Sequence, residues 1–153
     1  MESRQWFDAN VGVVSQATKV DEAASNIVKN LYRMIAMGMI NFDQFFRNIM
    51  ISPDGTVDFI DLGDSFTKEE MGENFNFENA VNEFVETVLD TITVSALRKA
   101  VDANTEELNE KIDDAVVRRW VTTQTEAHIA KRHGLLYRAG RKIIKRVEPY
   151  FRK

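Results

Sequence analysis

The 153-residue sequence contains no cysteine, only two prolines and no long run of apolar residues. Without cysteine the chain forms no disulfide, and with only two histidines it is a poor candidate for a structural zinc site. No apolar stretch is long enough to span a bilayer, and the first residues do not resemble a signal peptide. These absences predict a protein that works in a cytoplasm, either its own or that of a host cell into which it is delivered.

Charge is distributed unevenly along a chain of otherwise ordinary globular composition, with 44% apolar and 29% charged residues. The formal net charge is −4, but residues 127–153 hold nine Lys or Arg and one acid. That end therefore carries about +8, and residues 1–126 carry about −12. A basic end can bind nucleic acid or an anionic membrane, form a solvated helix face, or match an acidic body. Because it lacks the clustered aromatics of a dedicated binder, we do not expect nucleic acid to be the partner.

Helical periodicity begins near residue 18. Apolar residues recur on one face over residues 18–38, which predicts a helix with Thr18 as its N-cap and Gly38 at its end. Residues 1–17 are weakly patterned, and we expect Trp6 and Phe7 to anchor them to the core.

The widest apolar stripe covers residues 77–101 and predicts a long, buried central helix. Phe84 and Val88 lie in the middle of this stripe, so both should be almost fully buried. A further helix is expected over residues 105–125, and a final one to about residue 147, broken near Gly134.

One short segment has strand character. Two β-prone runs flank the turn sequence SPDG (residues 52–55) and predict a β-hairpin over residues 48–61. Beyond it, Thr67 and Glu70 have the spacing of a capping box for one turn of helix. The expected fold is a single domain over residues 1–153, mainly α with one small β-hairpin, in which helices pack as a bundle.

The hairpin carries carboxylates among apolar residues, which raises the question of a calcium loop. Placing Gly55 at the sixth position of an EF-hand loop puts Met50 at the first position, where a carboxylate ligand is required. The flanking segments are also predicted strands rather than helices. An EF-hand is therefore not expected.

A second pattern fits more of this segment. Asp43 is followed five residues later by Asn48, and thirteen residues after that comes Asp61, which begins the sequence Asp-Leu-Gly. This resembles the catalytic core of the protein-kinase-like fold, in which an aspartate, four residues, an asparagine, a hairpin and an Asp-Phe-Gly variant follow in order. The resemblance covers about residues 18–101, as in a kinase C-terminal lobe, and residues 102–153 are additional helices.

The resemblance implies a role for each polar residue. Asn48 and Asp61 would hold the Mg²⁺ of bound Mg–ATP, since both offer hard oxygen ligands. Asp43 would act as the base that orients and deprotonates the acceptor hydroxyl. Gly63 would let the chain turn sharply after the metal ligand, and Asp58 would point to solvent on the alternate face of its strand.

Several features depart from the family pattern. Asn41 stands where kinases usually carry His, Leu62 replaces the usual Phe, and no Ala-Pro-Glu motif follows. Residues 1–17 are too few for the N-terminal sheet, Gly-rich loop and lysine. Three functional classes therefore stay open: a phosphotransferase lobe that needs another protein to supply a cationic group, a non-catalytic pseudokinase-like interaction module, and nucleic-acid binding through the basic end.

Overall fold

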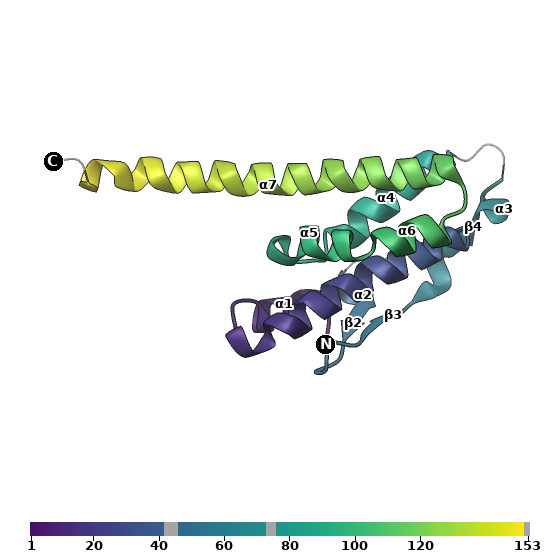
Figure 1. Ribbon diagram of the computed structural model, residues 1–153, viewed down its shortest axis with the longest axis horizontal. Coiled ribbons are helices and arrows are strands. Elements are labelled where there is room, and N and C mark those ends of the chain that lie inside the picture. Colours follow the sequence, from purple (N-terminus) through teal and green to yellow (C-terminus); the bar gives the residue numbers. More distant parts are fainter. Residues whose placement is uncertain (42–45, 73–75, 152–153) are drawn as a thin grey trace.

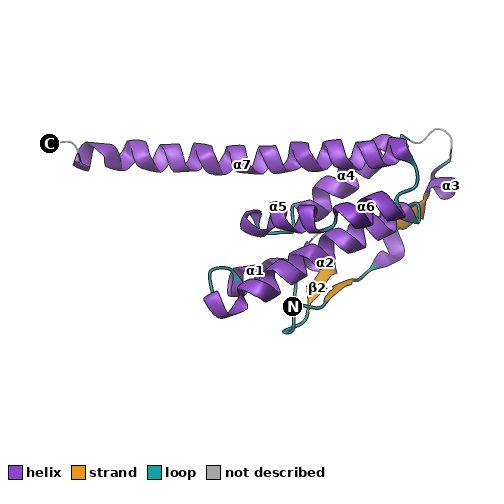
Figure 2. Cartoon of the chain, in the orientation of Figure 1, coloured by secondary structure: helices purple, strands orange, loops and turns teal. Residues whose placement is uncertain are grey.

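The computed structural model describes residues 1–41, 46–72 and 76–151. In this part of the chain, seven α-helices accompany two pairs of short antiparallel strands (Figure 1). Helix dominates the cartoon, and the strands gather on one side of it (Figure 2). The predicted fold class, mainly α with a small β-hairpin, is confirmed.

The elements have the following bounds. The helices are α1 Ser3–Asn10, α2 Ala17–Ala36, α3 Lys68–Met71, α4 Phe77–Leu89, α5 Val94–Ala103, α6 Thr105–Lys111 and α7 Ala115–Phe151. The strands are β1 Met39–Asn41, β2 Ile49–Ile51, β3 Val57–Phe59 and β4 Ser65–Thr67. Short 3-10 turns are η1 Val14–Gln16, η2 Phe46–Asn48 and η3 Leu62–Asp64.

Helix α2 lies at the centre of the molecule. It packs against α4, α5 and α6 on one side, while α1 and the β2–β3 hairpin lie on the other, and α7 crosses over α4 (Figure 1). Phe84 and Val88 of α4 are 1% and 0% exposed, so the expected burial of both residues is confirmed. Within the described residues, no helix is long and apolar enough to cross a bilayer.

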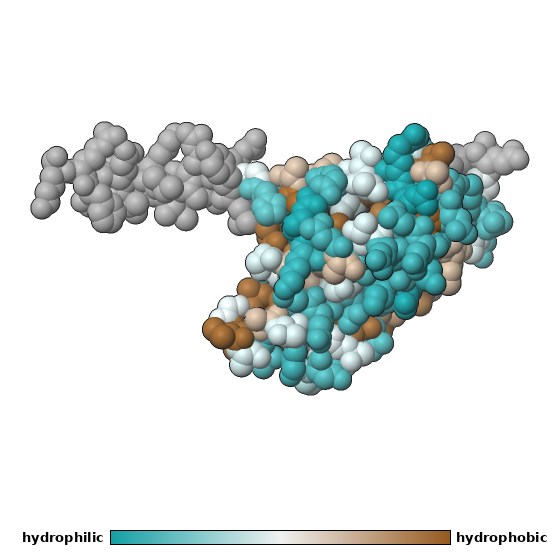
Figure 3. Space-filling view, in the orientation of Figure 1, coloured by the Kyte–Doolittle hydropathy of each residue, from teal (hydrophilic) through white to brown (hydrophobic). Residues whose placement is uncertain are grey.

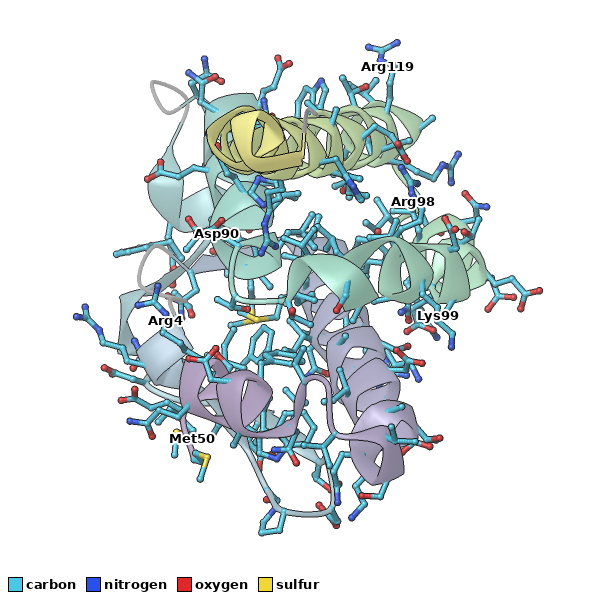
Figure 4. All side chains as sticks on the ribbon, turned by 90° about the vertical axis from the view of Figure 1, so that its left-hand side faces the viewer. Arg4, Met50, Asp90, Arg98, Lys99 and Arg119 are labelled. Carbon is cyan, nitrogen blue, oxygen red and sulfur yellow. The ribbon has the colours of Figure 1, made fainter. Side chains whose placement is uncertain are left out.

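Ion pairs link α5 to both of its neighbours. Arg98 projects toward α7 and donates two hydrogen bonds to the Glu126 carboxylate, at 2.8 and 2.6 Å (Figure 4). Lys99 projects toward α2 and donates to Asp21 at 2.6 Å. These pairs are largely exposed and contribute modestly to stability. They mark the two sides of α5 that face α7 and α2.

The single central helix predicted over residues 77–101 is wrong, because α4 ends at Leu89 and α5 begins at Val94. The Thr91 hydroxyl donates to the carbonyl of Val88 at 2.6 Å and so competes with continued helix. Ile92, inside the break, is still only 1% exposed. The apolar pattern thus continues through the residues between α4 and α5, so periodicity alone does not reveal that the helix ends there.

The helix predicted over residues 105–125 is also wrong, since α6 ends at Lys111 and α7 begins at Ala115. The Asp114 carboxylate accepts hydrogen bonds from the backbone N–H groups of Val116 and Val117, which caps the start of α7. The break predicted near Gly134 does not occur, because α7 runs through it to Phe151.

The N-terminal segment is more ordered than its pattern predicted. It forms α1, and Trp6 and Phe7 are each 3% exposed, so the expected anchoring is confirmed. Thr18 is not the N-cap of α2, because η1 runs directly into a helix that begins at Ala17. Gly38 lies beyond the end of α2 with φ 71°, a conformation that suits glycine.

Candidate functional site

Two antiparallel strand pairs bracket the candidate site. β1 pairs with β4, with Asn41 opposite Ser65, and β2 pairs with β3, with Ile49 opposite Phe59. The chain between β1 and β2 and the chain between β3 and β4 are therefore held together at both ends. The first contains Asp43 and Asn48, and the second contains Asp61 and Gly63. The β2–β3 hairpin confirms the prediction over residues 48–61.

The sequence did not predict the β1–β4 pair. Each strand has three residues, which is too short to show a periodic pattern. β4 leads directly into α3, where Thr67 and Glu70 form the predicted capping box with reciprocal hydrogen bonds of 2.9 and 3.3 Å. The cap fixes the direction in which the chain leaves the site.

Asn48 lies at the base of the hairpin and is 7% exposed. Its backbone carbonyl accepts a hydrogen bond from the N–H of Ile60 at 2.9 Å, which extends the β2–β3 ladder by one step. Asp61 is the next residue after Ile60. The ladder therefore brings the backbones of Asn48 and Asp61 to the same end of the hairpin.

Asp61 has an unusual backbone. Its φ and ψ are both 55°, in the left-handed region, and it is the one non-glycine residue with positive φ in the described chain. A non-glycine residue held in such a conformation costs on the order of 1–3 kcal/mol, and strain of this kind clusters at functional sites. The Asp61 side chain is exposed, so packing of this side chain in the core does not offset the cost of the left-handed conformation.

The role predicted for Gly63 is corrected by this geometry. Asp61, not Gly63, makes the left-handed turn, and Gly63 lacks positive φ. A Cβ added at Gly63 would meet Asp61 Oδ1 at 3.9 Å, which is ordinary van der Waals contact. The sharp turn therefore depends on aspartate, a residue type that tolerates the left-handed region better than most.

Asp43, the predicted base, lies outside the described residues. Asn41, two residues before it, is 1% exposed and occupies the end of β1. The position where kinases usually carry His is thus a buried strand residue at the edge of the site.

Two other aspartates of the hairpin are accounted for by the fold. Asp58 is exposed in the middle of β3, opposite Met50, as predicted for a solvent-facing residue. Asp54 accepts a hydrogen bond from the Thr56 N–H at 3.0 Å in the turn, and this bond lowers the pKa of its carboxyl group. Neither residue lies at the end of the hairpin that holds Asn48.

The donor set at the hairpin base suits Mg²⁺. An amide oxygen and a carboxylate are hard ligands, and Mg²⁺ commonly takes few protein ligands and completes its shell with water and phosphate oxygens. In the described residues, no cluster of three or more His, Asp or Glu could hold a metal ion by itself. Any Mg²⁺ at Asn48 and Asp61 would therefore depend on ligands from a bound nucleotide.

A second polar site, between α4 and α7, was not predicted from the sequence. A cavity of about 380 Å³ is lined by residues that include Asp90, His128 and Arg132. His128 is 3% exposed, its Nε2 lies 3.7 Å from Asp90 Oδ1, and burial lowers the pKa of its imidazole. Arg132 donates from Nη1 to the carbonyls of Leu89 and Ile92. The contributing segments are about forty residues apart, so no local motif marked them.

Comparison with known proteins adds no family to this description. The sequence matches no family model and no curated protein, and the fold matches no solved structure.

Proposed function

We propose that the chain binds Mg²⁺–nucleotide at the base of the β2–β3 hairpin, in the manner of a kinase-like phosphotransferase lobe. One observation carries the proposal: Asp61, in a left-handed conformation, directly follows the residue whose N–H bonds to Asn48. Aspartate tolerates this conformation better than most residues, and here the conformation falls at the end of the hairpin that also holds Asn48. A site that aims a carboxylate at a metal ion would account for the conformation at that place.

The proposed roles follow from the chemistry of phosphoryl transfer, which depends on positioning and charge neutralisation. Asn48 and Asp61 would hold Mg²⁺ against the phosphates of ATP. Asp43 would accept the proton of the attacking hydroxyl. The two strand pairs would keep Asn48 and Asp61 at a fixed separation, since β2 pairs with β3 and β4 pairs with β1.

The second candidate is a non-catalytic interaction module of pseudokinase type. Residues 3–10 form α1 rather than a strand and Gly-rich loop, so the described chain offers no such cover for the phosphates. Under the first proposal, another protein chain would supply the missing cationic group. Under the second, the helical lobe would serve as a binding surface and no transfer would occur.

Thermal unfolding with Mg²⁺–ATP or Mg²⁺–ADP tests the proposal. A ligand at a hundred times its Kd stabilises the folded state by about 2.7 kcal/mol. For a chain of this size, that corresponds to a rise in Tm of roughly 5–11 °C. The rise should require Mg²⁺ and vanish in Asp61→Asn, which loses the charged ligand.

Asp58→Asn is the matched control, because it makes the same change in the same hairpin at an exposed residue away from Asn48. It should retain the full rise in Tm. An equal response from both variants, or no response from the wild-type protein, would reject nucleotide binding at this site and favour the interaction module.

A further inference from the structure

A polar groove lies between the N-terminal parts of α4 and α7. Its volume is about 250 Å³, and its lining residues are Glu78 and Asn82 of α4 and Arg119, Trp120, Thr123 and Gln124 of α7. Residues three or four apart share one side of a helix, so each helix turns one side toward the groove. None of the lining residues belongs to the strands or to the chain between them, so the groove is separate from the hairpin site.

Trp120 supplies an aromatic wall. Its ring packs edge-on against Phe77, with the ring centroids 6.3 Å apart and the planes at 65°. Both rings also pack against the hydrophobic core. The Trp120 side chain is nevertheless only half-buried, so part of it stays accessible from the groove. A ring held in this way offers a stacking surface at little cost in side-chain freedom.

Two amide side chains in the groove have no hydrogen-bond partner in the described part of the protein. They belong to Asn82 and Gln124, and both residues are half-buried. Each amide has an oxygen that accepts hydrogen bonds and an NH₂ group that donates them. The groove can therefore bind donors and acceptors of a ligand beside the aromatic wall.

The charged residues of the groove balance each other. Glu78 and Arg119 contribute one charge of each sign. In the view along α7, Arg119 projects outward from the helix (Figure 4), so its guanidinium lies at the rim of the groove. A lining without net charge favours a neutral ligand over a phosphate or a metal ion.

The exposed apolar surface of the molecule lies mainly elsewhere. Val11, Val13 and Val14, in the connection between α1 and α2, are 39%, 43% and 92% exposed, and hydrophobic surface gathers at that end in the space-filling view (Figure 3). That patch has few polar groups to orient a ligand. The groove between α4 and α7 combines an apolar wall with several hydrogen-bonding groups, as small-molecule sites do.

These features favour a sugar ring over other flat ligands. A pyranose has hydroxyl groups around its edge, which match the amides, the Thr123 hydroxyl and the Glu78 carboxylate. One of its faces consists of C–H groups that can pack on an indole ring. A nucleobase has two apolar faces and usually stacks between two side chains, whereas Trp120 is the one aromatic residue in this lining.

We infer that the groove between α4 and α7 binds one sugar ring of a neutral saccharide. The ring stacks on Trp120 and exchanges hydrogen bonds with Asn82 and Gln124. This inference does not depend on nucleotide binding, because Asn48 and Asp61 take no part in the groove.

NMR titration of the full chain with neutral monosaccharides tests the inference. The probes are the methyl glycosides of glucose, galactose, mannose and N-acetylglucosamine, none of which carries phosphate. At least one should shift the side-chain amide signals of Asn82 and Gln124 and the indole N–H signal of Trp120, with a Kd of about 1 mM. The indole signal of Trp6, which is 3% exposed in the core, should not move and serves as an internal control.

Substitutions locate the binding. Trp120→Ala and Asn82→Ala should each raise the Kd at least tenfold. Asn79→Ala is the matched control, because it makes the same change at an exposed position of α4 outside the groove, and it should bind as the wild-type protein does. Circular dichroism checks the helix content of each variant. If Trp120→Ala loses helix, Asn82→Ala and Gln124→Ala still test the site, since both residues lie outside the core.

Three results would overturn the inference. The first is the absence of any shift in the wild-type protein with every glycoside at about 100 mM, a hundred times the expected Kd. The second is an unchanged Kd in Asn82→Ala. The third is tighter binding of adenosine than of every glycoside, which would assign the groove to a nucleobase.

Discussion

Arg132 stabilises the connection between α4 and α5, where the sequence had predicted one continuous helix. Its Nη1 donates to the carbonyl of Leu89 at 3.0 Å and to that of Ile92 at 2.6 Å. Burial lowers the pKa of its guanidinium, yet an arginine stays charged at neutral pH. Arg132→Met keeps most of the side-chain length and removes both hydrogen bonds.

The expected loss follows from those two bonds. Hydrogen bonds to charged donors contribute about 1.5–3 kcal/mol each, and water can partly replace the donor at a half-buried site, so we expect a loss of about 2–4 kcal/mol. Lys131→Met is the matched control at the adjacent position. Its side chain is 64% exposed and pairs with Glu86 at 3.2 Å, so the loss should stay below about 1 kcal/mol.

Urea unfolding followed by circular dichroism measures both variants. The midpoint should fall for Arg132→Met while the slope stays constant, since the surface exposed on unfolding is unchanged. Equal losses in the two variants would mean that Arg132 does not cap these carbonyls and that another contact maintains the break.

Three further predictions concern the core, the buried histidine and the proposed base. Phe84→Ala should destabilise by roughly 3–5 kcal/mol because it empties a fully buried site, whereas Phe66→Ala, at a position 41% exposed, should cost less than about 1 kcal/mol; a small loss at Phe84 would place α4 at the periphery. Burial lowers the pKa of His128, so the unfolded chain takes up its proton at higher pH than the folded chain, and stability should fall as pH drops below about 6.5. His128→Gln should flatten this part of the pH profile of urea midpoints, and an unchanged profile would assign it to other groups. Asp43→Asn should leave Mg²⁺–ATP binding intact and abolish any phosphate transfer, because a base acts in the reaction and adds little to the ground-state complex; loss of binding in the Tm assay would contradict that role.

Much of the fold was predictable where one local signal was strong. The helix over residues 18–38 and the hairpin over residues 48–61 have clear periodicity or turn chemistry, and both formed with small shifts of their ends. The breaks at Thr91 and Asp114 were missed because a side-chain hydrogen bond decides each of them while apolar residues continue on either side. Gly134 lowers helix propensity by only about 1 kcal/mol, too little to end α7.

The candidate site was predictable in part for a similar reason. Its residues were chosen by the spacing of Asp43, Asn48 and Asp61 in the sequence. The backbone hydrogen bond between Ile60 and Asn48 agrees with the hairpin expected between the last two. The left-handed conformation of Asp61 was not predictable, because Gly63 lies two residues later and is the residue type expected to make a sharp turn. The β1–β4 pair and the His128 cavity join segments far apart in the chain, which no window of sequence reveals.

Paramagnetic broadening by Mn²⁺–ATP tests the central claim most directly, because Mn²⁺ replaces Mg²⁺ and broadens the NMR signals of nearby nuclei. In the wild-type protein, the backbone amide signals of Asn48 and of residues 60–63 should broaden first, and those of α5 should stay sharp. The Asp61→Asn variant should lose this pattern, and Asp58→Asn should keep it. Broadening centred instead on Asp90 and His128, or no broadening at Asn48 in the wild-type protein, would contradict the proposal that the hairpin holds the metal of a bound nucleotide.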